Sequence, residues 1–560
     1  MKNQKLHIFE IVSAHKIKLI LIFILFLQLA FHLSAAYNTR YSAFPDEWEI
    51  VKKALHSPAD YNDYKYGKFI GFFYSIPLRA GMYLKGLDSS KIDWDFPVIL
   101  GDIYQVPHYL FLLRIARLVN LFFSLLICVL TYFIAKMFMP PIWATLSVAL
   151  LVVSPVFWCY SNLVKSESLT TFLALTCTLL VIRKVTSERE GRRNVFAATF
   201  FSALSFGIKY NFMTLAPIVM SLFKNPYFSK KKLSTLVFAM ILWGIVVLAI
   251  FNGVAYFVKT MEILNHQYLF RLPTGFKIVP HVPRYTYLFH TLILMLPFCI
   301  GLVLAPFALL GLLSFLLSDS CIKKIFIAFP LCHLLFFEII PIRIWNNYLP
   351  VTPYLIITAT YVIFICYQKG SKILGAGLLT AALVMGFFWG HSRIYQIYLD
   401  MHQSMQATRV VINKDFNAQS VLDGRLSFFF PGFEAMEGLQ WLNDPIQLKD
   451  KLENTSPEWI VAGSCYFDNY KKFGGEFCTW VGEFPERVMK EQTQYTGISI
   501  QWDYPMRSFF AMIDPEYDFG FYIFRRKDYN AKMLWNNDNL LIRMNAFLKQ
   551  EGCSISAYVQ

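Results

Sequence analysis

Two adjacent carboxylates follow the first apolar segment of the chain. They lie in the run Phe44-Pro45-Asp46-Glu47-Trp48-Glu49, about eight residues after an apolar stretch at 17–36 ends. At a membrane surface, Asp46 and Glu47 could deprotonate and orient an incoming hydroxyl, because a general base must lie within hydrogen-bond reach of the proton it takes. Proline and acidic side chains also suit the first turn of a helix. The two interpretations are compatible, and the pair is the first candidate catalytic site.

Four basic residues lie at the ends of apolar segments. Arg114 and Arg117 precede one such segment, Lys209 lies in SFGIKYNF between two, and Arg343 begins RIWNNYLPVTP. An ionisable group at membrane depth is costly when it is unpaired, so each is a functional candidate. Cations facing the acidic pair would suit a phosphate-bearing lipid. Snorkelling to the membrane interface is the ordinary alternative for any one of them.

Two further titratable residues are candidates, and several familiar motifs are missing. Glu167 in SNLVKSESL begins another apolar segment, although an acid also suits a helix N-terminus. The loop 259–286 carries His266 and His281, whose spacing matches no metal signature. The chain has no Walker loop, dinucleotide glycine fingerprint, HExxH motif or CxxC pair. Any activated donor would therefore have to be carried by lipid rather than by a nucleotide.

The elements that must position these residues are membrane helices. Of the 560 residues, 56% are hydrophobic and 16% are charged, whereas soluble domains are roughly 25% charged. This composition excludes a chain of soluble domains and a disordered chain. Ten cysteines in this length also exclude a small disulfide scaffold. The predicted fold class is a polytopic α-helical membrane protein with a polar appendage.

Eleven segments are expected to span the membrane, since a spanning helix needs about 20 apolar residues. They fall near 17–36, 116–136, 142–160, 167–183, 195–208, 211–223, 233–258, 286–317, 325–342, 349–367 and 373–391. The segments 195–208 and 211–223 are short, and 286–317 is long and carries Pro297 and Pro306. The expected number of spans is therefore ten to twelve.

The distribution of charge predicts an orientation. Residues 1–391 hold 35 Lys/Arg against 16 Asp/Glu, and residues 392–560 hold 17 against 21. The surplus lies in loops beside apolar segments, which is the positive-inside pattern, so no nucleic-acid partner is expected. The N-terminus is predicted to be cytoplasmic. The first loop, 37–107, and the tail, 392–560, are predicted to lie on the extracytoplasmic side.

The tail 392–560 is predicted to be a mixed α/β domain that follows a membrane module at 1–391. Residues 394–414 have a helical pattern, and the expected strands are SVLDG, EWIVAGS, ISIQWD, SFFAMID and FGFYIFRR. Cys465 and Cys478 lie in this tail, and both a disulfide between them and free thiols are open interpretations.

Taken in order, these motifs resemble the GT-C glycosyltransferases that use polyprenyl-phosphate sugars. The likeness is greatest to the family 39-like group of protein O-mannosyltransferases and lipid A aminoarabinose transferases. The segments that carry it are Pro45-Asp46-Glu47, RIARLVNLFFSLLICVLTYFIAKMF, SPVFWCYSNLVKSESLTTFLAL, ALSFGIKYNFMTLAPI and NNYLPVTPYL. In the last segment an Arg or His often precedes the tyrosine in the family, whereas Asn347 precedes Tyr348 here, and Arg343 is the expected substitute.

The resemblance implies a single inverting displacement in which a lipid phosphate leaves from a polyprenyl-phosphate sugar. It casts Asp46 as general base for an acceptor hydroxyl or amine, and Glu47 as the residue that holds the acceptor or the base. It implies that the donor phosphate contacts Arg117, Lys209 and Arg343, and that further substrate contacts come from Glu167, Tyr348 and His266. Cations at the leaving phosphate would stabilise its charge. No cofactor and no divalent metal is expected, because the lipid-linked sugar is a substrate.

Two other functions stay open. A transporter or lipid flippase without covalent chemistry would often show two similar halves, and the chain has no internal repeat. In an assembly or scaffold component, the carboxylates would only cap a helix. The expected partners of the enzyme are the lipid bilayer, the lipid-linked donor and an acceptor that is a protein, a lipid or a glycan. The expected location is a bacterial inner membrane.

Overall fold

The computed structural model describes a helical part and a sheet. The residues that it describes are 2–38, 45–55, 69–88, 107–161, 163–186, 191–209, 211–223, 230–250, 254, 257–258, 296–339, 345–388, 420–423, 440–442, 459–463, 483–489, 495–502, 520–526 and 555–558. The structure therefore covers most of the predicted membrane module and separate pieces of the tail.

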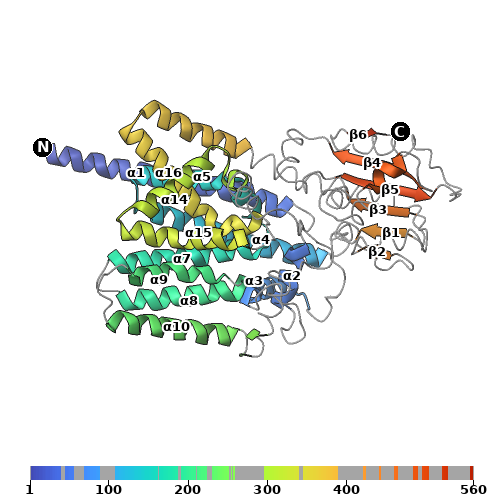
Figure 1. Cartoon of the computed structure of the whole chain (residues 1–560), viewed down its shortest axis with the longest axis horizontal. Helices are drawn as coiled ribbons and strands as arrows, with labels where there is room; N and C mark the ends of the chain where they lie inside the picture. The colour runs from blue at the N-terminus through green and yellow to red at the C-terminus, as the bar shows by residue number, and fades with distance from the viewer. Residues whose placement is uncertain are drawn as a thin grey trace.

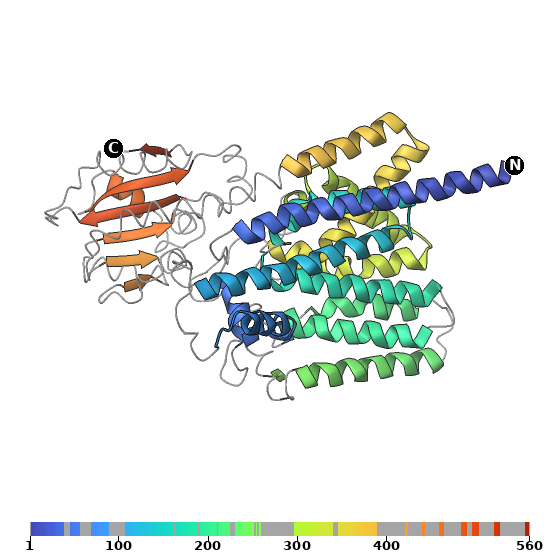
Figure 2. The same cartoon turned by 180° about the vertical axis from the view of Figure 1, so that it is seen from behind.

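The described residues up to 388 are almost wholly helical, as the composition predicts (Figures 1 and 2). The helices are α1 (Lys2–Asn38), α2 (Pro45–Leu55), α3 (Phe69–Leu84), α4 (Pro107–Ala135), α5 (Pro141–Val152), α6 (Pro155–Tyr160), α7 (Ser166–Thr186), α8 (Gly191–Lys209), α9 (Ala216–Phe223), α10 (Lys230–Ile250), α13 (Leu296–Ile300), α14 (Leu304–Leu317), α15 (Cys321–Ile339) and α16 (Thr352–Lys369). Two 3-10 segments, η2 (Phe212–Leu215) and η5 (Trp345–Val351), precede α9 and α16, and a further apolar helix covers Lys372–Phe388.

Four described helices are long and apolar enough to cross a membrane: His15–Leu33, Leu110–Ala135, Ser166–Val185 and Asn347–Lys369. Shorter apolar helices accompany them. The chain is thus an integral membrane protein with several apolar helices. In the first of the four only 11% of the residues are buried, whereas 72% are buried in the last. The N-terminal helix lies at the margin of the helical part (Figure 2), and the Asn347–Lys369 helix lies inside it.

Prolines and one glycine set where several helices begin or break. Helices α2, α4, α5 and α6 each start on a proline, which suits the first helical position because it has no N–H to leave unpaired. The predicted continuous span 142–160 is wrong in this respect, since α5 ends at Val152 and α6 begins at Pro155. Within the predicted span 286–317, the chain breaks between α13 and α14 at Gly301, whose φ of 93° favours glycine.

Two hydrophobic cores and a minor cluster hold the described helices together. The larger core joins α4, α5, α6, α7, α14, α15 and α16, the smaller core joins α2, α3, α4, α7 and α8, and the minor cluster joins α8 and α10. Within the helices, buried threonines and serines bond to the carbonyl four residues earlier, as Thr131 does to Ile127 at 2.7 Å. This pattern satisfies a hydroxyl inside an apolar helix without a second helix. The smaller core is the one that carries the helix with the acidic motif.

Glycines allow two close helix contacts. A Cβ on Gly71 of α3 would lie 2.9 Å from the main-chain oxygen of Lys53 in α2. A Cβ on Gly311 of α14 would lie 2.5 Å from the main-chain oxygen of Thr358 in α16. Only glycine allows backbones to approach this closely. The contact at Gly71 fixes α2 against α3.

The described part of the tail forms a six-stranded sheet (Figure 1), with the order β2-β1-β3-β5-β4-β6. Its strands are β1 (Ser420–Asp423), β2 (Gln440–Leu442), β3 (Trp459–Gly463), β4 (Tyr495–Trp502), β5 (Gly520–Arg526) and β6 (Ile555–Tyr558), and the short helix α21 spans Phe484–Met489. The β1–β2 and β1–β3 pairs are parallel, and the β3–β5, β4–β5 and β4–β6 pairs are antiparallel.

Four of these strands overlap segments that the sequence predicts, namely β1, β3, β4 and β5. Strands β2 and β6 were not predicted. The predicted helix 394–414, the strand SFFAMID and the cysteines Cys465 and Cys478 lie outside the described residues. The placement of 392–560 as an extracytoplasmic domain stays a prediction.

Candidate active site

The acidic motif forms the start of helix α2. Pro45 takes its first position, and Asp46 follows in the backbone with a side chain that lies outside the described part of the chain. Glu47 is fully buried and is bound twice by Arg117 of α4, from Nε to Oε1 at 3.0 Å and from Nη2 to Oε2 at 2.8 Å. A two-point bond between planar groups fixes direction as well as distance. The pair therefore ties the start of α2 to α4.

Glu47 also holds the loop between α6 and α7. Its Oε1 accepts the main-chain N–H of Val164 at 3.0 Å. Asn120 of α4 donates its Nδ2 to the carbonyls of Tyr160 and Ser161, at 3.0 and 3.2 Å. Buried backbone groups need partners, and these bonds supply the ones that an irregular loop lacks. The loop in turn fixes where α7 begins.

Tyr74 of α3 bonds to Asn120, which holds this loop, and the charges of Glu47 and Glu167 act on its phenol. Its hydroxyl donates to Asn120 Oδ1 at 3.3 Å. Burial raises the pKa of the Tyr74 phenol, and the negative charges of Glu167 and Glu47 raise it further. The phenol is therefore protonated and can serve as the donor. Since both carboxylates act on one phenol, they lie in the same electrostatic neighbourhood.

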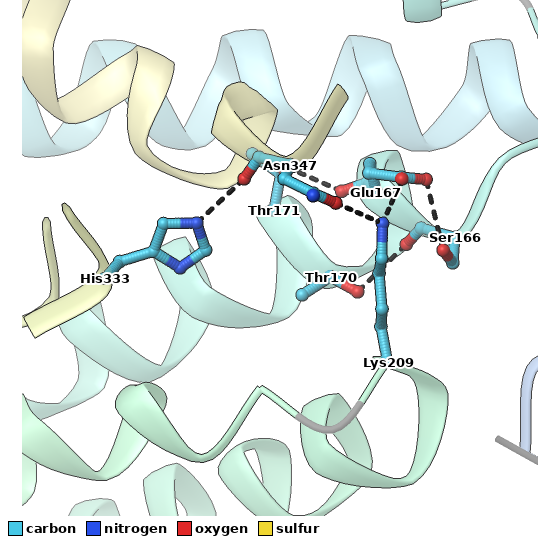
Figure 3. A network of polar contacts seen from close by, with 7 residues as sticks. All are labelled: Ser166, Glu167, Thr170, Thr171, Lys209, His333 and Asn347. Atoms are coloured by element: carbon cyan, nitrogen blue, oxygen red, sulfur yellow. Dashed lines mark hydrogen bonds and ion pairs between the residues drawn. The ribbon is translucent and has the colours of Figure 1, made fainter. Parts of the chain in front are cut away.

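A second polar cluster joins α7, α8 and η5 (Figure 3). Lys209, the last residue of α8, forms an ion pair with Glu167 in the first turn of α7. Its Nζ also donates to Asn347 Oδ1 at 2.9 Å. The hydroxyl of Ser166 donates to Oε2 of Glu167 at 3.1 Å. Three segments that are far apart in the sequence thus meet at one ammonium group.

Lys209 is the member of this cluster that a ligand can reach. Its side chain is 26% exposed, whereas that of Glu167 is 2% exposed. A lysine ammonium has three N–H donors, and Glu167 and Asn347 take two of them. Within the described part of the chain, Lys209 has no third partner. One N–H is therefore open to a ligand anion on the accessible side.

The segment η5 is fixed behind Asn347. The main-chain carbonyl of Asn347 accepts a hydrogen bond from His333 Nε2 of α15 at 2.7 Å (Figure 3). The next residue, Tyr348, is fully buried, and its ring lies 6.0 Å from that of Phe337. One side of η5 therefore packs into the core, and the Asn347 side chain reaches Lys209.

The two clusters differ in what they can do chemically. Glu47 and Arg117 are both 0% exposed and bind each other at two points, an arrangement suited to holding helices together. In the second cluster a buried carboxylate holds a partly exposed cation, and Lys165 adds a second buried cation whose charge acts on Glu167. Such a partly desolvated cation is suited to binding an oxyanion.

The predicted site residues fall into three groups. Glu167 and Lys209 meet in one cluster, and Glu47 meets Arg117 in the other. Asp46 and Tyr348 lie in described helical segments, Tyr348 with a buried ring. Arg343 and His266 lie outside the described residues. The catalytic and binding roles of all eight stay predictions.

Sequence reasoning missed three residues that organise the site. Asn120, His333 and Asn347 all make buried or half-buried hydrogen bonds that position its parts. The signal for Asn347 was visible, because it stands where the resembled family often has a cation. Asn120 lies on the same helix as Arg117, three residues later, which is the spacing of one helix face. Among the described residues, no group of three or more His, Cys, Asp or Glu side chains could hold a metal ion.

No protein-family model and no curated protein sequence matches the chain. The structure is similar to solved structures at low sequence identity. One is ArnT from Cupriavidus metallidurans bound to undecaprenyl phosphate, with 11% identity, a TM-score of 0.48, and coverage of 81% of this chain and 95% of that chain. The apo ArnT structure from the same organism has 12% identity, a TM-score of 0.47, and coverage of 79% and 92%.

A third similar structure is the archaeal oligosaccharyltransferase AglB from Archaeoglobus fulgidus, in complex with an inhibitory peptide and a dolichol-phosphate. It has 11% identity and a TM-score of 0.46, and the alignment covers 94% of this chain and 75% of that chain. The resemblance to lipid-phosphate sugar transferases that the sequence motifs indicate is thus confirmed as a likeness of structure over most of the chain, at low identity.

Proposed function

We propose that the chain is a membrane glycosyltransferase that moves a sugar from a polyprenyl-phosphate donor to an acceptor on the extracytoplasmic side. The observation that carries this proposal is the junction of the two clusters. Glu47 binds the N–H of Val164 at 3.0 Å, and Glu167 in the first turn of α7, three residues later, binds Lys209. The helix that carries Asp46 is therefore held at the loop before α7, and the partly exposed lysine is held at the start of α7.

Asp46 is the general base of this proposal. It precedes Glu47 on α2, and the Glu47–Arg117 pair and the Val164 bond leave α2 little freedom to move. In the reaction, the Asp46 carboxylate takes the proton from an acceptor hydroxyl or amine, whose oxygen or nitrogen then bonds to the anomeric carbon. The bond from that carbon to the phosphate oxygen breaks, and the configuration inverts. Glu47 and Arg117 position this helix.

Lys209 is the phosphate ligand of this proposal. Its open N–H meets the oxygen of the lipid phosphate, where negative charge grows as the sugar departs. A pre-positioned cation at such a point typically contributes on the order of 10²- to 10³-fold in rate. Glu167 holds the lysine in place through their ion pair. Solved structures similar to this chain include ArnT with undecaprenyl phosphate and AglB with a dolichol-phosphate, which guides the choice of ligand for the test.

The test follows the lipid product. Purified full-length protein is incubated with undecaprenyl-phosphate sugars and candidate acceptors, and released undecaprenyl phosphate is measured. Asp46→Asn should lower the rate of release by about 10²-fold or more, because it removes the base while the side chain keeps its size and shape. Asp88→Asn, on the described segment that follows α3, is the matched control and should turn over like the wild type. Equal turnover of Asp46→Asn and wild type would remove Asp46 from the mechanism.

A further inference from the structure

The amide of Asn347 has a fixed orientation beside the open N–H of Lys209. An ammonium group can only donate hydrogen bonds, so the atom of Asn347 that faces Lys209 at 2.9 Å must be the amide oxygen. The NH₂ group then points away from the lysine. Asn347 is half-buried, and no described residue takes a hydrogen bond from its Nδ2. Two N–H groups of Asn347 and one of Lys209 are thus open together.

The main chain of Asn347 is held so that this orientation persists. Its carbonyl accepts a bond from His333 Nε2 at 2.7 Å. Because a carbonyl only accepts, Nε2 of His333 carries the proton, and the ring is a fixed donor. The ring of His333 is itself packed between Phe329 and Phe337, with centroids 5.4 and 4.7 Å away. Asn347 is therefore clamped at its main chain by α15 and at its side chain by α8.

We infer that Asn347 is a further substrate-binding residue, whose side-chain amide donates to an oxygen of the donor lipid's phosphate beside Lys209. This inference rests on the proposed function, and it adds a residue that the sequence motifs did not assign to the phosphate. A neutral amide and a single ammonium make three hydrogen-bond donors with one positive charge. Hydrogen bonds from such donors to an anionic oxygen are stronger than those between neutral groups. His333 is the positioning residue for Asn347.

The variant Asn347→Asp distinguishes two roles of Asn347, namely binding of the phosphate and positioning of Lys209. An aspartate at this position still accepts from the lysine and strengthens that pair, so a purely structural role survives the change. It has no N–H to donate and adds a negative charge beside the phosphate. The probe is undecaprenyl phosphate, added to the purified full-length protein in nanodiscs and followed by tryptophan fluorescence. The dissociation constant should rise about tenfold or more in Asn347→Asp, from the loss of a charge-assisted bond.

Three further variants keep the outcomes distinct. Lys209→Met tests the proposed function, and its affinity for undecaprenyl phosphate should also fall. His333→Gln keeps a donor for the Asn347 carbonyl and should bind as the wild type does, whereas His333→Phe should bind more weakly. The thermal unfolding midpoint of each variant reports whether it folds.

The inference is overturned if Asn347→Asp binds undecaprenyl phosphate within twofold of the wild type while Lys209→Met binds weakly. If Lys209→Met also binds as the wild type does, the proposed phosphate site is wrong as well. If His333→Gln binds as weakly as His333→Phe, the positioning role of His333 is wrong.

Discussion

At the scale of single residues, the site consists of charged side chains that form ion pairs with buried partners. Glu47 and Arg117 lie 70 positions apart in the sequence, and Glu167 and Lys209 lie 42 apart. A charge at membrane depth is tolerated when it is paired. The first pair is closed to solvent, and the second leaves one face of a lysine open. This difference favours a structural role for the first pair and supports the proposed phosphate binding at Lys209.

The buried Glu47–Arg117 pair gives a prediction about stability. Glu47→Gln leaves a buried guanidinium without its carboxylate, which should lower the free energy of unfolding by about 3–5 kcal/mol. Replacing both partners, Glu47→Leu with Arg117→Met, removes the uncompensated charge and should recover most of that loss. Thermal unfolding of the purified variants in detergent measures both effects. A double variant no more stable than Glu47→Gln would show that the pair is not the source of the loss.

The same double variant also tests the role of Glu47. If Glu47 only positions α2, the folded double variant should keep measurable release of undecaprenyl phosphate, reduced because the Val164 bond is also lost. If Glu47 takes part in proton transfer, release should be as low as in Asp46→Asn. The single-turnover rate in the presence of saturating acceptor distinguishes these cases.

The sequence predicted which residue types would matter, and it predicted few of the pairings. Asp46, Glu47, Glu167 and Lys209 stood out because ionisable groups beside apolar segments need an explanation. Arg117 was expected at the phosphate, which stays a prediction, and its pairing with Glu47 was not foreseen. The pairing of each cation with a carboxylate depends on how the helices pack, and local sequence patterns do not indicate this packing. Asn347 stood out only as a departure from the resembled family, and its uncharged amide indicated no partner.

At the scale of elements, the site depends on short segments between helices. The loop that connects α6 and α7 is held by Glu47 of α2, by Asn120 of α4 and by His32 of α1, whose ring nitrogens lie 3.1 and 3.2 Å from Ser161 Oγ. The sequence predicted one span near residues 142–160, and the structure divides it between α5 and α6. The break lets the chain turn into the loop that carries Val164.

The contact of α2 with α3 gives a prediction at this scale. A Cβ at Gly71 would lie 2.9 Å from the main-chain oxygen of Lys53, and a main chain cannot yield as a flexible side chain can. Gly71→Ala should therefore displace α2 and with it Asp46. We expect the rate of sugar transfer to fall at least about tenfold, because a misplacement of the order of 1 Å at a reacting group is costly.

A matched control for this prediction is Gly244→Ala on α10, where nothing lies within 4 Å of the added Cβ. It should transfer sugar at the rate of the wild type and should be slightly more stable, since alanine favours helix. A Gly71→Ala variant with the activity of the wild type would show that the α2–α3 contact does not set the position of Asp46.

At the scale of the whole molecule, composition and charge predicted the class of protein well. The described residues up to 388 are helical, and four helices are long and apolar enough to span a membrane. The order of strands in the tail could not be predicted, because β1 pairs with β2 and β3 in parallel, and β3 pairs with β5 although β4 lies between them in the sequence. Local sequence patterns do not predict such pairings between distant segments.

The predicted orientation has a direct test. Alkaline phosphatase, which is active only outside the cytoplasm, should be active when fused after Gln560 in a bacterial host. It should be inactive when fused within the basic segment that ends α7, at Arg183 or Lys184. The positive-inside rule is the physical reason for both results. Active enzyme at the α7 fusion with inactive enzyme at the C-terminus would reverse the orientation and place the proposed site in the cytoplasm.

The proposed mechanism requires that Asp46 and Lys209 face the same lipid-phosphate sugar. A cryo-EM structure of the full-length protein in nanodiscs with undecaprenyl phosphate would show whether they do. We expect a phosphate oxygen about 3 Å from Nζ of Lys209, with the Asp46 carboxylate turned toward the same space. A phosphate bound away from Lys209, or an Asp46 side chain turned away from the phosphate, would contradict it.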